Sequence, residues 1–183
     1  MSPRPTTNHI NHRFASRDCR KQPIQTLLRR SNILVTGGTG YLGRTLVATL
    51  LKEGAGSVRI LSRNRSPQKE LIQDLRADNL DCVAGDVRDS RFVRKAVDGM
   101  NIVIHAAAMK SVEACEARPR ETIATNLDGT ANVLKASLER GVSRALCLST
   151  LLAVQPQTVY GASKLLVERL VGALSETAAG RHS

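Results

Sequence analysis

Aromatic residues are almost absent from this sequence: its 183 residues include two Tyr, two Phe and no Trp. Apolar residues still make up 42% of the chain, so a core has to be built from Leu, Val, Ile and Ala side chains. A surface that stacks nucleic-acid bases between aromatic side chains is disfavoured, because only Phe14 lies among the basic residues near the N-terminus. The scarcity of aromatics therefore indicates an aliphatic globular domain.

Long hydrophobic runs and paired cysteines are also missing. No apolar stretch approaches the roughly 18 residues that cross a membrane, and no signal-peptide pattern is visible. The four cysteines are scattered without a Cys-x-x-Cys pair; they are Cys19, Cys82, Cys115 and Cys147. Free thiols of this kind are typical of a reducing compartment, and Cys82 and Cys147 are predicted to be buried in strands. We therefore expect a cytoplasmic protein without a membrane span.

Positive charge is concentrated in the first 30 residues, which hold seven Lys or Arg and one Asp in a chain of net charge +11. This segment has no apolar periodicity and is predicted to be a mostly disordered, solvated tail. Binding of nucleic acid or of an anionic surface is the alternative. His9 and His12 lie in it without further ligands nearby, so no metal site is predicted. A second, short disordered tail is predicted for residues 176–183.

The stretch ILVTGGTGYLG, residues 33–43, has the pattern of a phosphate-binding turn. Apolar β-formers lead into Thr36, and Gly37, Gly40 and Gly43 recur at three-residue spacing before an apolar helical pattern. Such a turn places free backbone N–H groups and the positive end of a helix dipole against a dinucleotide pyrophosphate. The alternative is a strand-to-helix turn that only requires glycine.

Short apolar runs alternate with helical patterns along the chain. We predict strands around residues 33–36, 57–61, 80–84, 101–105 and 143–149. We predict helices over residues 41–53, 66–76, 90–97, 119–140 and 159–174, the third of them capped by Ser90. This alternation indicates an α/β fold, a doubly wound parallel (Rossmann) sheet ordered 3-2-1-4-5. It forms a single predicted domain over residues 31–175.

The end of the second predicted strand bears on the choice of dinucleotide. It reads Ser62-Arg63-Asn64-Arg65, with no carboxylate before Glu70. A carboxylate at this place holds the ribose hydroxyls of NAD, whereas an arginine suits the 2′-phosphate of NADP. NADP is therefore favoured over NAD, with two exposed loop arginines as the alternative. Asp86, after the third strand, is placed either to accept from the adenine amine or to cap the following helix.

Tyr160 and Lys164 stand four residues apart, which places both side chains on one face of the last predicted helix. An ammonium group beside a phenol favours the phenolate and lowers the pKa of the tyrosine. Tyr160 could then act as acid and base near neutral pH while Lys164 holds a ribose. Thr150, at the end of the fifth strand, would supply a hydroxyl that completes the site. His105, at the end of the fourth, is predicted to pack.

The motifs TGGTGYLG, GDVRD, HAAAMKSV, TNLDGT, LST and YGASK together resemble the extended short-chain dehydrogenase/reductases. In particular, they are similar to the UDP-N-acetylglucosamine 4,6-dehydratases of bacterial polysaccharide synthesis, over about residues 32–172. The resemblance implies bound NADP, a nucleotide-sugar substrate and a lyase reaction. The catalytic positions it implies are Thr150, Tyr160 and Lys164. The cofactor-binding positions it implies are Thr36, Gly37, Gly40, Tyr41, Leu42, Gly43, Arg63, Asp86, Val87, Ala106, Ala107, Lys110, Tyr160 and Lys164.

Two departures from the family pattern bear on activity. Family members usually read Ser-Thr-Asp-Lys after the fifth strand, where the Asp protonates the leaving C6 hydroxyl and the Lys helps remove the C5 proton. This chain has Leu151 and Leu152 there. Family chains also continue well past the position of Ser183 into a substrate domain. We therefore expect a truncated, catalytically impaired member or a non-enzymatic NADP(H)-binding remnant, whose bare fifth strand a partner or second copy could cover.

Overall fold

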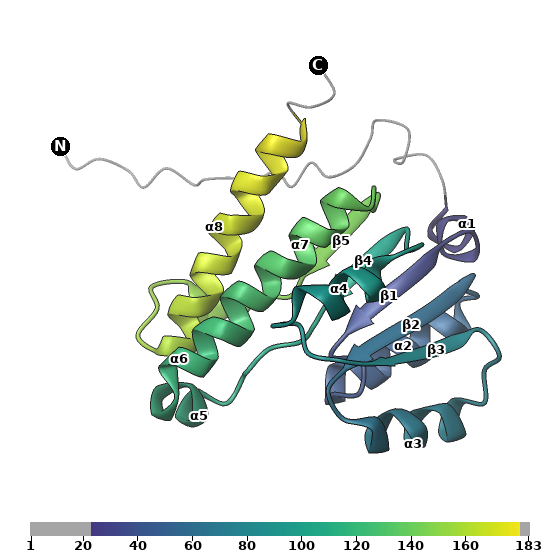
Figure 1. Cartoon of the computed structure of the whole chain (residues 1–183), viewed down its shortest axis with the longest axis horizontal. Coiled ribbons are helices and arrows are strands. Elements are labelled where there is room, and N and C mark those ends of the chain that lie inside the picture. The colour runs from purple at the N-terminus through teal and green to yellow at the C-terminus, as the bar shows by residue number, and fades with distance from the viewer. Residues whose placement is uncertain (1–22, 180–183) are drawn as a thin grey trace.

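A parallel sheet forms the centre of the chain, whose structure is a computed structural model describing residues 23–179 (Figure 1). Its strands are β1 (Asn32–Thr36), β2 (Ser57–Ser62), β3 (Leu80–Ala84), β4 (Ile102–His105) and β5 (Arg144–Cys147). They lie in the order β3-β2-β1-β4-β5, so the predicted fold and strand order are confirmed. The central strand β1 pairs in parallel with β2 and with β4.

Helices connect the strands and cover both faces of the sheet. They are α1 (Ile24–Arg29), α2 (Tyr41–Lys52), α3 (Arg65–Leu75), α4 (Ser90–Val97), α5 (Val112–Ala117), α6 (Pro119–Thr122), α7 (Gly129–Glu139) and α8 (Val159–Ala179). A π-helical segment, η2 (Ile123–Asp128), joins α6 to α7, and a 3₁₀ turn, η3 (Leu151–Ala153), precedes α8. Figure 1 shows α8 running beside α7.

Alternation along β1 explains how both faces of the sheet are buried. Ile33 and Val35 point to one face, where they join a cluster that includes Val47 of α2. Leu34 points to the other face, in a cluster with Val133 of α7. Successive side chains of a strand point to opposite faces, so a continuous apolar strand requires helices on both sides. Both clusters are aliphatic, as the scarcity of aromatic residues predicts.

The helix predicted over residues 119–140 is interrupted. After the single turn of α6, the six residues Ile123–Asp128 form η2, and regular α-helix resumes at Gly129. A π-turn holds more residues than an α-turn, so it rotates the side chains around the helix axis. Thr125 and Asn126 are buried as a result, directly beneath the edge of the sheet at which β4 ends.

Two smaller boundaries also differ from the predictions. Asp89, and not Ser90, caps α4: the Asp89 carboxylate accepts the backbone N–H of Arg91 at 2.9 Å. An ionised carboxylate is the stronger acceptor, and it already stands at the N-cap position. The fifth strand ends at Cys147 and not at residue 149, because its partner β4 ends at His105, the residue paired with Cys147.

The ends of the chain also refine the predicted boundaries. Residues 1–22 of the predicted tail, with His9, His12 and Cys19, lie outside the described residues. Residues 24–29 form α1, whose Leu27 and Leu28 pack against the cluster on the α2 side, and this burial accounts for a helix there. At the other end α8 continues to residue 179, past the predicted boundary at residue 175.

Three cysteines of the described part of the chain are free thiols. Cys115 is buried, whereas Cys82 and Cys147, which were predicted to be buried, are half-buried in their strands. Within residues 23–179, no helix is long and apolar enough to cross a membrane. Nor do three His, Cys, Asp or Glu side chains of this part come together as metal ligands.

Candidate functional site

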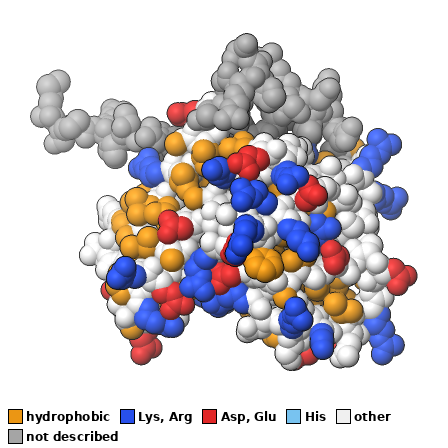
Figure 2. All heavy atoms as spheres, in the orientation of Figure 1, with side chains coloured by type: hydrophobic (Ala, Val, Ile, Leu, Met, Phe, Trp, Pro, Cys, Tyr) orange, Lys and Arg blue, Asp and Glu red, His pale blue; other side chains and the backbone are white. Residues whose placement is uncertain are grey.

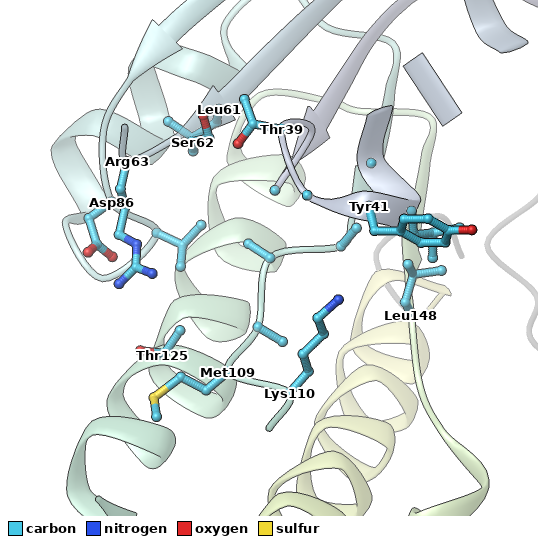
Figure 3. Close-up of a pocket in the computed structure, with 18 of the residues that line it drawn as sticks. Thr39, Tyr41, Leu61, Ser62, Arg63, Asp86, Met109, Lys110, Thr125 and Leu148 are labelled. Carbon is cyan, nitrogen blue, oxygen red and sulfur yellow. The ribbon is translucent and has the colours of Figure 1, made fainter. Parts of the chain in front are cut away.

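A cleft of about 360 Å³ opens at the carboxyl edge of the sheet. It lies where the strand order reverses, between β1 and β4. In Figure 2 the molecular surface is indented at its lower margin, on this side of the sheet. Arg63 and Asp86 stand at one end of the cleft and Tyr41 and Leu148 at the other, with Lys110 reaching into the space between them (Figure 3). We call these the Arg63 end and, after the predicted catalytic residue, the Tyr160 end.

Most of the predicted cofactor-binding residues meet at this cleft. Those that line it are Gly37, Gly40, Tyr41, Leu42, Gly43, Arg63, Asp86, Val87, Ala106, Ala107, Lys110, Tyr160 and Lys164. Thr36 does not: it is fully buried under the glycine turn, where its hydroxyl bonds to His105 and to the N–H of Ala107. Thr150 also lies outside the lining, beside Tyr160.

The glycine turn between β1 and α2 requires glycine at two positions for reasons of space. Gly37 has a φ of 69°, and a Cβ there would stand 2.8 Å from the backbone of Ala107. A Cβ on Gly43 would stand 2.2 Å from the carbonyl oxygen of Gly37. The turn is therefore packed against the loop after β4 on one side and folded tightly on itself on the other. Gly40, the N-cap of α2, provides no side-chain cap, which leaves the first N–H groups of α2 facing the cleft.

The Arg63 end holds one paired and one unpaired basic side chain. The Asp86 carboxylate accepts the backbone N–H of Arg88 at 2.9 Å and pairs with the Arg88 guanidinium at 2.7 Å. Burial alone would raise the pKa of Asp86, but the hydrogen bonds from Arg88 outweigh it and hold the pKa below its ordinary value. Arg63 makes no ion pair within residues 23–179, although it lines the cleft beside Asp86.

Lys164 is the most deeply buried cation of the Tyr160 end, with 6% of its surface exposed. Its ammonium donates to the carbonyl oxygen of Leu148 at 2.9 Å. Burial lowers the pKa of Lys164, and the neighbouring Cys147 and Glu168 act in the opposite direction. Glu168 also accepts the hydroxyl hydrogen of Ser149, which lines the cleft.

The pKa of Tyr160 moves in the direction opposite to the prediction. Burial is the main cause of its rise, Cys115 adds to it, and a hydrogen bond with Thr150 only partly offsets it. Lys164 does not act as predicted because its ammonium is held at the Leu148 carbonyl and is not directed at the phenol. The surroundings of Tyr160 in this structure therefore favour the phenol over the phenolate.

Leu151 and Leu152 lie in η3, outside the lining of the cleft. Leu151 is 88% exposed and Leu152 47% exposed, so neither side chain is needed to fill the core. A Cβ on Gly161 would stand 2.3 Å from the carbonyl oxygen of Leu152, so the backbone of η3 lies directly against the first turn of α8. The turn is thus held against α8, and its leucine side chains have no acid or base to offer.

One residue that sequence reasoning missed is Thr125. It lines the cleft from η2 with 7% of its surface exposed, and its hydroxyl is the one buried side-chain polar atom without a hydrogen-bond partner among the described residues. Such an atom is rare in a folded protein and marks a place where a ligand or water completes the site. No sequence signal distinguished it, because the π-turn that turns it inward was not predicted.

Comparisons with known proteins show the family of the chain. A sequence model of the family described as "Polysaccharide biosynthesis protein" matches residues 33–182. The chain is 40% identical over 149 residues to an uncharacterized membrane protein of Methanocaldococcus jannaschii (81% of this chain, 45% of that one). It is 39% identical over 142 residues to the UDP-glucose 4-epimerase of Rickettsia rickettsii (75% and 42%). It is 37% identical over 158 residues to the inverting UDP-N-acetylglucosamine 4,6-dehydratase of Campylobacter jejuni (86% and 47%).

Solved structures show the same arrangement of elements. Pen from Bacillus thuringiensis superposes with a TM-score of 0.78 at 36% identity, over 80% of this chain and 45% of that one. WbmG from Bordetella bronchiseptica, in complex with NAD, superposes with a TM-score of 0.66 at 29% identity, over 77% of this chain and 49% of that one. The chain therefore spans about half the length of these relatives.

Proposed function

Because the chain belongs to the polysaccharide biosynthesis protein family, we propose that its cleft binds a nicotinamide dinucleotide, with NADP favoured over NAD. We further propose that this domain serves a short-chain dehydrogenase/reductase that modifies a nucleotide sugar, of the 4,6-dehydratase type, with impaired turnover. The observation that carries the proposal is the cleft itself. One continuous space joins a glycine turn and Arg63 to Tyr160 and Lys164 across the point at which the strand order reverses.

The residues present fit a dinucleotide. The hydroxyl of Thr125, which has no hydrogen-bond partner among the described residues, supports the proposal that a polar ligand occupies the cleft. The two glycines whose Cβ atoms would collide with backbone let the chain approach a pyrophosphate closely, and the uncapped first turn of α2 offers it free N–H groups. Arg63 supports NADP because its guanidinium is free to bind a 2′-phosphate. It has no ion pair among the described side chains, and the nearby Asp86 carboxylate is already paired with Arg88.

Cofactor choice is tested by titrating the full chain with NADPH and with NADH and following nucleotide fluorescence. We expect tighter binding of NADPH. Arg63→Ala should weaken NADPH roughly 10- to 100-fold, the value of a hydrogen bond between charged groups, and leave NADH within about threefold. Arg65→Ala is the matched control, since Arg65 stands two residues away and outside the cleft lining. Equal losses for both nucleotides, or loss in the Arg65 variant, would contradict the assignment of Arg63.

The chemistry open to the chain follows from its own side chains. When bound, the nicotinamide supplies hydride transfer to and from a substrate carbon. In this proposal Tyr160 exchanges a proton with a substrate hydroxyl, and the Thr150 hydroxyl is hydrogen-bonded to it. Lys164 brings a cation to the same end of the cleft. Loss of water from the sugar needs a further acid and base, and Leu151 and Leu152 supply neither.

Binding without turnover is the second candidate function. It is favoured because Leu151 and Leu152 offer no acid or base in η3 and because the Lys164 ammonium is held at the Leu148 carbonyl oxygen. Incubating the chain with UDP-N-acetylglucosamine and NADP at high protein concentration distinguishes impaired dehydratase activity from binding alone. We expect no 4-keto product from the wild type. Slow formation of that product would favour the impaired dehydratase over binding alone, and rapid formation would contradict the proposed impairment. Production of it only by Leu151→Asp with Leu152→Lys would assign the impairment to η3.

The outer edge of β5 is the place we propose for a partner. No strand of residues 23–179 pairs with that edge, and Leu146 of β5 is half exposed. We propose that a strand from a partner or a second copy covers it in the cytoplasm. Sedimentation of the wild type against Leu146→Lys tests this: a shift of the variant to a smaller species is expected, and identical monomers in both would oppose it.

A further inference from the structure

A row of buried polar side chains runs beneath the cleft and joins the ends of β1 and β4 to η2 and α7. The Thr36 hydroxyl lies 2.6 Å from Nδ1 of His105. On the other side of the ring, Nε2 lies 2.9 Å from the Thr130 hydroxyl. That hydroxyl in turn donates to the carbonyl oxygen of Asn126. His105 is 3% exposed and both its neighbours are equally buried, so the ring is held by two hydrogen bonds and does not only fill space.

The partners fix which ring nitrogen carries the hydrogen. A carbonyl oxygen can only accept, so Thr130 gives its single hydroxyl hydrogen to Asn126. Thr130 must then accept at its oxygen, and the donor is Nε2–H of His105. A neutral ring with hydrogen on Nε2 accepts at Nδ1, so Thr36 donates to it and receives the N–H of Ala107 at 3.2 Å. All the bonds therefore run in one direction, from Ala107 to Asn126.

The row holds the wall of the cleft at both of its ends. At one end it fixes Ala107 through its backbone N–H. The backbone of Ala107 lies so close to the glycine turn that a Cβ on Gly37 would stand 2.8 Å from it. At the other end it reaches the Asn126 backbone, and the Asn126 side chain bonds both the N–H and the carbonyl of Met109. Both ends of the loop 106–110 are thus fastened to one network.

The same network reaches the Tyr160 end. The amide nitrogen of Asn126 donates to the Ser163 hydroxyl at 3.0 Å, and Ser163 donates to the carbonyl oxygen of Tyr160 at 2.7 Å. His105 itself does not line the cleft. It occupies the centre of the row, so removing either ring nitrogen would separate the glycine turn from η2.

We propose that His105 is a positioning residue of the cleft: as the Nε2–H tautomer, it ties Thr36 to Thr130 and so sets the loop 106–110 against the glycine turn. The wall that it positions is the wall of the proposed cofactor site, and in that respect the inference rests on the proposed function. The tautomer and the coupling between the three side chains do not depend on any ligand.

The tautomer is tested by long-range ¹H–¹⁵N correlation spectra of the uniformly ¹⁵N-labelled full chain, with His105→Asn used to assign the ring. The expected signature is one protonated nitrogen, Nε2, and one unprotonated acceptor, Nδ1, unchanged from pH 5 to pH 8. Lys164 is the charged side chain that acts on the ring, and its positive charge also opposes ring protonation. A hydrogen on Nδ1, or rapid exchange between tautomers, would overturn the assignment.

The positioning role is tested at Thr130, which does not line the cleft. Thr130→Val should weaken NADPH binding about fivefold, the value of one hydrogen bond, whereas Thr130→Ser, which keeps the hydroxyl, should restore it within about twofold. His105→Leu should weaken it roughly tenfold, and adding Thr130→Val to that variant should cost nothing more. Ser31→Ala is the control, since Ser31 is equally buried and donates to Leu27 at the opposite end of β1.

The outcomes separate this inference from the proposed function. If the wild type fails to bind NADPH and NADH, the proposed function falls, and the non-additivity of Thr130→Val and His105→Leu is measured on urea unfolding instead. If NADPH binds but Thr130→Val and Thr130→Ser behave alike, or the two losses simply add, the positioning role of His105 is wrong. If His105→Leu does not fold, the Thr130 pair and the spectra still decide.

Discussion

The two ends of the cleft hold their charges in opposite ways. At the Arg63 end, Asp86 and Arg88 pair at the surface and the guanidinium of Arg63 stands free beside them. At the Tyr160 end, the Lys164 ammonium is almost fully buried and bonds to a backbone carbonyl, and the neutral ring of His105, buried beneath the cleft, bonds to two hydroxyls. Solvent and opposite charge stabilise the first end, whereas burial and neutral hydrogen bonds define the second. Substitutions and solution conditions should therefore act on the two ends very differently.

The pKa values carry the same contrast. Hydrogen bonds from Arg88 lower the pKa of Asp86 despite its partial burial, so pairing dominates at the Arg63 end. Burial is the main cause at the Tyr160 end, where it raises the pKa of Tyr160 and lowers those of Lys164 and His105. In each of these three cases the neutral form is favoured. Burial at the Tyr160 end thus disfavours charged forms, and the Lys164 ammonium is kept there by the carbonyl oxygen of Leu148 and by the nearby Glu168 carboxylate.

The largest effect is expected where the two ends meet, at the glycine turn. Gly43→Ala places a Cβ 2.2 Å from the Gly37 carbonyl oxygen and should lower the free energy of unfolding by about 3 kcal/mol while abolishing binding of NADPH and NADH alike. Gly172→Ala is the matched control, because a Cβ there meets nothing within 4 Å in α8 and should raise stability by up to about 1 kcal/mol. Urea unfolding measures both variants, and a Gly43 variant as stable as wild type would oppose the tight-turn account.

A change of intermediate size in the free energy of unfolding is expected when the pH is lowered, because of the buried ring of His105. Burial lowers the pKa of His105 from 6.5 to about 3, so below pH 6.5 the unfolded chain binds a proton that the folded chain refuses. The folded state then loses stability as the pH falls, by about 2 kcal/mol between pH 7 and pH 5. His105→Asn has no such titration and should show a flatter dependence in urea unfolding across this range. Identical slopes for variant and wild type would contradict the burial of a neutral ring.

The smallest effect is expected from the surface pair of the Arg63 end. Asp86→Asn removes the partner of Arg88 and should lower the free energy of unfolding by less than about 1 kcal/mol, an amount that high salt reduces further. Since the folded pKa of Asp86 lies below its ordinary value, its contribution is complete above about pH 4 and is lost only in stronger acid. The comparison of the two ends fails if the difference in stability between this variant and the wild type changes near pH 6, where only His105 is expected to act.

Sequence reasoning reached the parts of the molecule that periodicity and glycine spacing determine. The strand order and the identity of the turn at Gly37 follow from alternating apolar runs, whose ends lie at one edge of a parallel sheet. Thirteen predicted cofactor-binding residues line one cleft for this reason: all of them follow a strand or begin a helix at that edge. Their roles toward a ligand stay predictions.

The remainder depends on orientation within an element, which periodicity does not contain. The π-turn that buries Thr125 preserves the apolar pattern of the flanking α6 and α7, so the segment reads as one continuous helix. The spacing of Tyr160 and Lys164 gives a common helix face but not the direction of a flexible ammonium, which bonds Leu148. His105 was predicted to pack because burial is visible in a strand pattern and hydrogen-bond partners 25 and 69 residues away are not.

The central place of β1 has a consequence for the order in which the chain folds. Residues paired between β1 and β2 are 25 apart in sequence, whereas those paired between β1 and β4 are 69 apart. Short loops close at lower entropic cost, so during synthesis β1, β2 and β3 can assemble before β4 has left the ribosome. The glycine turn would then wait, exposed, for the wall that completes the cleft. We expect nascent chains from which α4 and α7 have not yet emerged to bury the Ile33 face of β1 while leaving Leu34 accessible to labelling or proteolysis, because both helices contribute to the cover of Leu34.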